Sequence, residues 1–188
     1  MADERVYPLF LRLDGRRVLV VGGGSVAARK IADLVDAGAA VHVVAPGASD
    51  DVSALARSAT IRWDARPFDE GDVRGSWLVV AATDDPAVQR AVFEACEAAH
   101  VFCVAVDDVP NASAFNGSVV RRDPFAVAIS SSGAAPALTR LVREIIEHVL
   151  PEAAWVERAR ALRARWKAEG APMESRFAEL VREIAGSG

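Results

Sequence analysis

The residues with the clearest chemical role form a glycine-rich turn, Gly22-Gly23-Gly24-Ser25-Val26-Ala27. They fit the pattern G-x-G-x-x-A between a run typical of a strand and a segment with helical periodicity. The first glycine allows the tight turn, the second lets the backbone approach a pyrophosphate, and Ala27 lets helix and strand pack closely. Free amide groups at the positive end of the helix would bind the phosphates. The turn therefore predicts a dinucleotide site, and the alternative is a glycine-rich turn without a ligand.

The corner after the second expected strand bears on the choice of nucleotide. The acidic residue that usually contacts the NAD ribose would fall near Ala45, and Ala45-Pro46-Gly47 stands there instead. No arginine stands there to favour NADP. Asp50 and Asp51 follow, and either a contact with the ribose or the first turn of the next helix would explain them.

Two acidic segments follow later strands, Ala81–Asp85 and Val104–Asp108. Ligands of open α/β sheets bind at the carboxyl ends of the strands, so Thr83 and Asp84 could edge the cofactor, while Asp85 is expected to cap a helix. Asp107 is expected to end a buried strand on the same rim. Its carboxylate there could act as a general base, although the residues alone favour a turn former.

A polar stretch between residues 121 and 133 offers further candidates. Ser130-Ser131-Ser132-Gly133 precedes a helix expected to open at Pro136, and capping is favoured over anion binding. Arg121 and Arg122 could pair with substrate carboxylates, or they could be the charged residues that are common in a turn between strands. A basic strip on a later helix is interpreted first as a solvated face; it consists of Arg158, Arg160, Arg163, Arg165 and Lys167.

Positioning these residues requires a sheet that gathers strand ends on one rim. Most of the expected strands are continuously apolar, as in a parallel sheet covered on both faces; they span 17–22, 41–45, 61–66, 77–83 and 101–107. Intervening helices have readable ends, such as Gly38 after the first and Asp85-Pro86 before a later one. The resulting order, β-α-β-α-β-β-α-β, predicts an α/β fold with a Rossmann-like doubly wound parallel sheet.

The pattern changes after Asp107. Residues 113–122 and 125–131 are expected to be extended, and the weak alternation of the second run favours burial on both sides. A strong amphipathic helix follows from Pro136, and two more helices lie beyond Pro151. We expect a NAD-binding domain over 1–112, a small α+β segment over 113–150 and a helical segment over 151–188.

Composition narrows the function classes. The chain has 188 residues, 52% of them apolar, which fits a soluble globular protein. Its net charge of −4 argues against a nucleic-acid partner. No apolar run reaches the ~20 residues of a membrane span, and the start lacks a secretory signal. Cys96 and Cys103 fit no metal or redox spacing and His42 fits a packed strand, so we expect free thiols, no metal site and a cytoplasmic location.

Taken together, these motifs resemble precorrin-2 dehydrogenase, the N-terminal module of siroheme synthase, which in some members is also a sirohydrochlorin ferrochelatase. The resemblance runs from about Tyr7 to Leu150. It rests on Tyr7-Pro8-Leu9-Phe10-Leu11, Leu13-Asp14-Gly15, Val20–Lys30, Ala81–Asp85, Phe102-Cys103, Val106-Asp107-Asp108, and Ala128-Ile129-Ser130 leading to Gly133 and Pro136.

The resemblance implies NAD-dependent oxidation of precorrin-2 to sirohydrochlorin by a homodimer built through Ser113–Val149. It implies that Asp107 is catalytic. It also implies cofactor contacts at Ser25, Val26, Pro46, Gly47 and Thr83, beside the glycines Gly22 and Gly24. The family's phosphorylatable serine falls near Ser131.

The sequence departs from the family at two places. Val104 stands where an asparagine is frequent, and Ser131-Ser132-Gly133-Ala134-Ala135 replaces a more glycine- and threonine-rich segment. Iron or cobalt insertion and the choice of NAD over NADP stay open. Two other readings are an oxidoreductase acting on another small molecule and a non-catalytic NAD-binding redox sensor. A short-chain dehydrogenase is excluded because Tyr7 is the only tyrosine.

Overall fold

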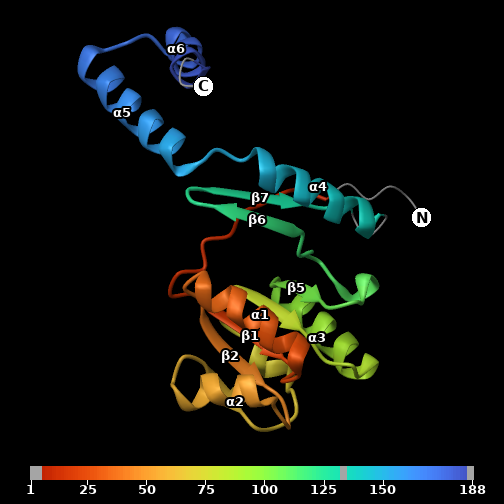
Figure 1. The fold of residues 1–188 in the computed structure, drawn as a ribbon. Coiled ribbons are helices and arrows are strands. Elements are labelled where there is room, and N and C mark those ends of the chain that lie inside the picture. Colours follow the sequence, from red (N-terminus) through yellow and green to blue (C-terminus); the bar gives the residue numbers. More distant parts are fainter. Residues whose placement is uncertain (1–5, 132–134, 186–188) are drawn as a thin grey trace. The chain divides into compact units, whose positions relative to one another are not determined.

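The computed structural model describes residues 6–131 and 135–185. The chain divides into two compact units, Met1–Asn116 and Gly117–Gly188, coloured from red to green and from green to blue (Figure 1). The serine-glycine segment Ser132-Gly133 lies outside the described residues.

Five parallel strands form the sheet of the first unit, in the order β3-β2-β1-β4-β5. This confirms the expected Rossmann-like doubly wound sheet. The strands are shorter than the apolar runs that predicted them: β1 (Arg17–Val21), β2 (Ala40–Val44), β3 (Arg62–Asp64), β4 (Leu78–Ala81) and β5 (Phe102–Ala105). β5 therefore ends two residues before Asp107, which corrects the expectation that this residue closes the strand.

Helices cover both faces of the sheet, as the apolar strands predict. α1 (Ser25–Asp36) and α2 (Asp50–Arg57) pack on the face that buries Val18 and Val20. α3 (Pro86–Ala99) and the short 3₁₀ helix η1 (Glu70–Val73) pack on the opposite face. The alternation of side chains along each strand produces these two separate apolar clusters, one on each face of the sheet.

The edge of the sheet explains where the first unit ends. After η2 (Val109–Asn111), the backbone N–H groups of Ser113 and Ala114 both donate to the carbonyl of Cys103, at 2.9 Å. The Ser113 hydroxyl accepts from the Cys103 N–H at 2.9 Å. Residues 113–116 thus complete the edge of β5 and belong to the first compact unit.

The second unit is a hairpin followed by three helices. β6 (Ser118–Arg122) and β7 (Phe125–Ile129) pair antiparallel, and α4 (Pro136–Val149), α5 (Ala153–Glu169) and α6 (Met173–Ala185) follow. The expected burial of β7 on both sides is wrong, because Phe125, Ala126 and Ala128 are exposed. A two-stranded ribbon within one chain cannot enclose both of its faces. No helix within 6–131 and 135–185 is long and apolar enough to cross a membrane.

A polar network lies within the apolar strands of the first unit. His42 is buried, as predicted; its Nδ1 lies 3.0 Å from the Arg17 guanidinium and its Nε2 lies 3.0 Å from an Asp64 carboxylate oxygen. Arginine only donates, so Nδ1 must accept and the ring proton is on Nε2. Arg66 continues the network to Asp72 through two hydrogen bonds of 2.8 and 2.6 Å. The network ties β1, β2 and β3 to η1.

Both cysteines are free, as the sequence predicts, and both are buried. A hydrogen bond with Cys103, together with burial, holds the pKa of the Cys96 thiol above its ordinary value. The pair is therefore part of the packing between α3 and β5.

Candidate functional site

The glycine turn begins with a residue that no other amino acid could replace without movement of the backbone. Gly22 has φ of +119°, and a Cβ built there would lie 2.0 Å from the carbonyl oxygen of Ala82. Its N–H donates to the Val44 carbonyl at 3.1 Å. Gly22 thus lets the turn after β1 pass between the ends of β2 and β4.

The middle glycine of the turn, Gly23, is required by a close backbone contact. A Cβ on Gly23 would lie 2.3 Å from the Gly47 carbonyl oxygen, and the Gly23 carbonyl accepts the N–H of Ser49 at 2.8 Å. The turn after β1 and the loop after β2 are therefore in direct contact. The consecutive glycines were the available signal, but the pattern G-x-G-x-x-A leaves this position free.

The third glycine leaves the end of α1 open. Gly24 is the N-cap of α1, makes no side-chain cap, and a Cβ on it would meet no atom within 4 Å. The first turn carries no acidic residue, Ser25 is exposed and Val26 is half-buried. The unpaired amides of a helix start bind anions. This open, positively polarised end fits a pyrophosphate.

At the corner after β2, the exposed residues offer a ligand backbone groups and no carboxylate side chain. Ala45 is 3% exposed, whereas Pro46 and Gly47 are exposed, and a Cβ on Gly47 would meet nothing within 4 Å. Asp50 and Asp51 form the first turn of α2, where acidic side chains stabilise a helix. Ser49 caps the same helix by accepting from the Val52 N–H.

The end of β4 lies beside the glycine turn. The N–H of Ala82 donates to the Val21 carbonyl at 2.8 Å. Thr83 is half-buried, and its hydroxyl accepts from the Asp85 N–H at 3.3 Å. Asp85 caps α3 as predicted, accepting from Ala87 N–H at 2.8 Å. Its carboxylate is therefore structural.

Asp107 stands on the same rim, in a turn after β5. Its side chain is exposed and its φ of +57° is left-handed, a conformation that aspartate tolerates better than most residues. The N–H of Val106 donates to the Ala81 carbonyl at 2.9 Å, which places the turn beside the end of β4. The strand order β1-β4-β5 thus puts Thr83 between the glycine turn and Asp107.

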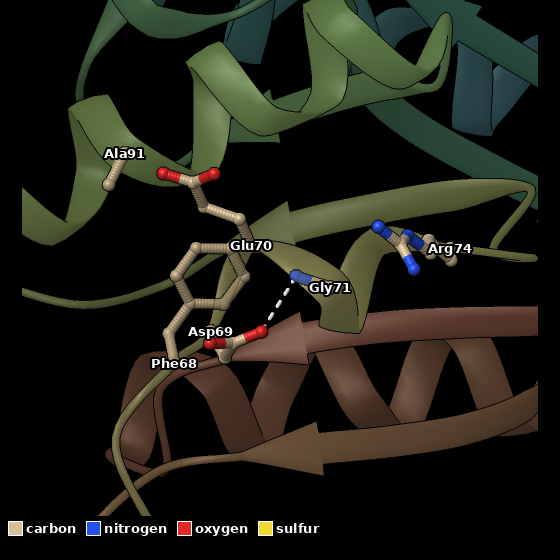
Figure 2. Close-up of a pocket in the computed structure, with 6 residues that line it drawn as sticks. All are labelled: Phe68, Asp69, Glu70, Gly71, Arg74 and Ala91. Atoms are coloured by element: carbon tan, nitrogen blue, oxygen red, sulfur yellow. Dashed lines mark hydrogen bonds between the residues drawn. The ribbon is translucent and has the colours of Figure 1, made fainter.

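A hollow of about 550 Å³ elsewhere in the first unit is not this site. Figure 2 shows its lining from η1 and α3, which consists of Phe68, Asp69, Glu70, Gly71, Arg74 and Ala91. None of these residues belongs to the rim, and Asp69 accepts the Gly71 N–H at 2.9 Å, the dashed line in Figure 2. Its lining therefore includes a helix cap and no residue of the predicted site.

Some basic side chains of the second unit make hydrogen bonds or ion pairs within the chain, and others are exposed without an ion pair to any described residue. Arg122 donates to the carbonyls of Leu150 and Glu147 at 2.6 and 2.8 Å, so it closes the end of α4 rather than facing a ligand. On α5, Arg160 and Arg165 pair with Glu157 and Glu179. The exposed cations without an ion pair in the described part of this unit include Arg121, Arg158, Arg163 and Lys167.

Ser131 makes local contacts before α4. Its hydroxyl oxygen accepts from the Thr139 hydroxyl at 2.8 Å and from the Ala135 N–H at 3.2 Å. It therefore holds the residue that precedes the helix, while the helix itself has no side-chain cap. No group of three or more His, Cys, Asp or Glu able to hold a metal occurs among residues 6–131 and 135–185.

Comparison with known proteins places these features in a family. Residues 9–118 match the family described as "Putative NAD(P)-binding", and residues 122–148 match "Sirohaem biosynthesis protein central". Siroheme synthase 1 of Aeromonas salmonicida (strain A449) is 46% identical over 171 residues, covering 90% of this chain and 36% of its own length. Siroheme synthase 1 of Cronobacter sakazakii is 49% identical over 144 residues, covering 77% and 31%. The chain spans about a third of these curated relatives.

A solved structure supports the same assignment over nearly the whole chain. SirC, a precorrin-2 dehydrogenase, superposes with a TM-score of 0.76 at 25% identity, covering 95% of this chain and 89% of its own. Together these matches show an NAD(P)-binding chain that belongs to the family of precorrin-2 dehydrogenase and the N-terminal module of siroheme synthase.

Proposed function

We propose that this protein oxidises precorrin-2 to sirohydrochlorin with NAD, as a step in siroheme biosynthesis. One observation carries the proposal: the open start of α1 and the exposed carboxylate of Asp107 lie on the same rim of one rigid sheet. The likeness to SirC covers almost all of both chains, which supports this activity for a chain that spans only part of the siroheme synthases.

Each residue of the rim has a distinct task in this chemistry. A bound NAD supplies the hydride acceptor. The amides at the start of α1, at Ser25 and Val26, bind the pyrophosphate, while Pro46 and Gly47 contact the adenosine half. Thr83 lies beside the nicotinamide half. Dehydrogenation removes a hydride and, separately, a proton from the macrocycle: the hydride goes to bound NAD and Asp107 accepts the proton, so the products are sirohydrochlorin, NADH and a protonated carboxyl.

NAD is proposed over NADP on charge grounds. A 2′-phosphate needs a cation at the corner after β2, and the segment from Ala45 to Asp51 contains none. Two carboxylates, Asp50 and Asp51, open α2 directly after that corner. They would repel the additional phosphate of NADP.

A homodimer built through the second unit is proposed from its exposed apolar residues. Leu138, Leu141, Ile145 and Val149 recur at helical spacing on α4 and are each at least half exposed. Phe125 and Val119 of the hairpin are also exposed. Such a surface is typical of an interface that a second copy covers.

The substrate is a polycarboxylate, so exposed cations that make no ion pair with any described residue are candidates to contact it. Arg121, Arg158, Arg163 and Lys167 satisfy that condition, and Arg122 does not, because α4 engages its guanidinium. Guanidinium groups suit carboxylates because they donate in pairs.

An anaerobic assay with precorrin-2 and NAD tests the proposed function. NADH and sirohydrochlorin, each followed by its absorbance, should form together and in equal amounts. Insertion of Fe²⁺ or Co²⁺ into sirohydrochlorin is then measured in a separate assay without NAD. Tight NAD binding with no NADH formed would favour the redox-sensor alternative. NADH formed only with another small molecule would favour a different oxidoreductase.

A further inference from the structure

We propose that Trp63 is a positioning residue for the adenosine half of the dinucleotide, acting through the backbone of Ala45. The inference rests on the proposed function. Trp63 lies in β3, outside the glycine turn and outside every motif that predicts the site. Its indole Nε1–H donates to the Ala45 carbonyl at 3.1 Å.

The same strand holds the other side of that peptide. The N–H of Ala45 donates to the carbonyl of Asp64 at 3.3 Å, and Asp64 is fixed in turn by the His42 ring at 3.0 Å. Both backbone polar groups of Ala45 are therefore engaged by consecutive residues of β3. This arrangement defines a clamp, formed by Trp63 and Asp64 on Ala45.

The clamp fixes one end of the segment that would meet the ligand. At the other end of this segment, the Ser49 N–H donates to the Gly23 carbonyl at 2.8 Å. Gly47 also packs closely on Gly23, because a Cβ built on Gly23 would lie 2.3 Å from the Gly47 carbonyl oxygen. Pro46 and Gly47 thus form an exposed shelf between two fixed points. The shelf adjoins the glycine turn, in which Gly24 is the N-cap residue of α1.

Rigidity of this shelf matters more here than in a site with an acidic residue after β2. The Ala45 side chain is buried and carries no hydrogen-bonding group, so the exposed residues of this corner, Pro46 and Gly47, offer the ribose peptide groups and shape. Peptide groups hold a ligand well only when the backbone is already ordered, because otherwise binding has to order it. The Trp63 indole supplies that order.

The substitution Trp63→Phe tests the proposal because it keeps an aromatic side chain on the core and removes only the N–H donor and part of the ring. Kd for NAD and for ADP should both rise by roughly 3- to 10-fold, the equivalent of one neutral hydrogen bond. KM for NAD should rise in parallel, while kcat with precorrin-2 at saturating NAD stays at the wild-type value. If Trp63→Phe is unfolded at the assay temperature, Trp63→Tyr is measured in its place, with the same expected changes in Kd and KM.

Trp77→Phe is the matched control. Trp77 precedes β4 at the opposite end of the strands, is 60% exposed, and stacks on the Arg16 guanidinium at 3.5 Å. Its replacement should leave both Kd values unchanged. The proposal is overturned if folded Trp63→Phe binds NAD and ADP as the wild type does, or if it loses kcat with KM unchanged. A wild-type protein that binds neither nucleotide would instead overturn the proposed function.

Discussion

The side-chain amide of Gln89 on α3 donates to the carbonyl of Val106 at 3.1 Å, one residue before Asp107. Gln89 is 5% exposed, so the hydrogen bond is shielded from water. It anchors the left-handed turn that presents Asp107 at the rim. The Oε1 atom of the same side chain is buried and makes no hydrogen bond with the described residues. Within the described residues, the Gln89 side chain is therefore held by the hydrogen bond that its amide nitrogen donates to Val106.

Gln89→Leu should therefore impair catalysis although Asp107 itself is not substituted. Removing the donor leaves the Val106 carbonyl unpaired and lets the turn move, and misplacement of a reacting group by about 1 Å can cost ~100-fold in rate. We expect kcat to fall by roughly 10- to 100-fold with Kd for NAD unchanged. Arg90→Leu, at an exposed neighbouring position on α3, is the control. Full kcat in Gln89→Leu would contradict the prediction.

Asp107→Asn should separate binding from chemistry. The amide has nearly the shape of the carboxylate but cannot accept the proton, so NADH formation from precorrin-2 should fall by roughly 100-fold or more. NAD binding, measured by calorimetry, should be preserved. In the control Asp108→Asn, the new amide oxygen can still accept from the Asn111 side chain, which lies 2.7 Å from the present carboxylate. Near-normal turnover by the Asp107 variant would remove this residue from the mechanism.

The glycines of the turn should respond oppositely to alanine. At Gly24, φ is −76° and the space around a Cβ is free, so Gly24→Ala should fold with unchanged or slightly higher thermal stability. Its methyl group would enter the space proposed for the pyrophosphate, and Kd for NAD should rise about 10-fold or more. Gly22→Ala should instead lower thermal stability, because its Cβ would meet Ala82 backbone. Unaltered NAD affinity in Gly24→Ala would place the pyrophosphate elsewhere.

The sequence predicts the sheet and the rim well because both depend on short-range patterns. Continuous apolar runs are required for strands covered on both faces, and glycines at fixed offsets are required for the turn. The Asp85 cap is a local signal of the same kind. These features need no knowledge of which distant residues meet.

Contacts between distant residues could not be predicted in this way. The Trp63 indole reaches Ala45 from another strand, and His42 looks like one more member of an apolar strand although it joins Arg17 and Asp64. β7 has the composition of a core strand, but most of its residues are exposed in the single chain. Periodicity reports that a face is apolar and does not report what covers it.

Asp72 should make stability depend on pH in the acid range. Hydrogen bonds from the Arg66 guanidinium hold the pKa of Asp72 below its ordinary value of 3.8, although partial burial opposes this. Since the folded pKa is the lower one, the stabilisation is fully present above 3.8 and is lost as pH falls through the folded pKa. Asp72→Asn should lower the free energy of unfolding at pH 7 by about 1–3 kcal/mol.

Urea unfolding between pH 7 and pH 2.5 measures this effect. The difference between Asp72→Asn and wild type should shrink as the pH falls below the ordinary aspartate range. Asp33→Asn, at an exposed position on α1, should follow the wild-type curve. A constant difference at every pH would show that the loss is one of packing and not of the carboxylate's charge.

The apolar face of α4 should hold the proposed homodimer together. Ile145 is 54% exposed in the single chain and lies between Leu141 and Val149 on that face. Burying one isoleucine contributes about 1.5–3 kcal/mol, and a two-fold interface counts each substitution twice. Ile145→Glu should therefore raise the dimer Kd by at least ~100-fold and give a monomer in light scattering at micromolar concentration.

Arg140→Gln is the control for that experiment, because Arg140 is a well-exposed cation on the same helix, 3.0 Å from Glu144. It should remain a dimer. The rim residues all belong to the first unit, so the Ile145→Glu monomer should still bind NAD with the wild-type Kd. A dimer of unchanged affinity would exclude this face from the interface. A monomer that no longer binds NAD would show instead that the second copy completes the nucleotide site.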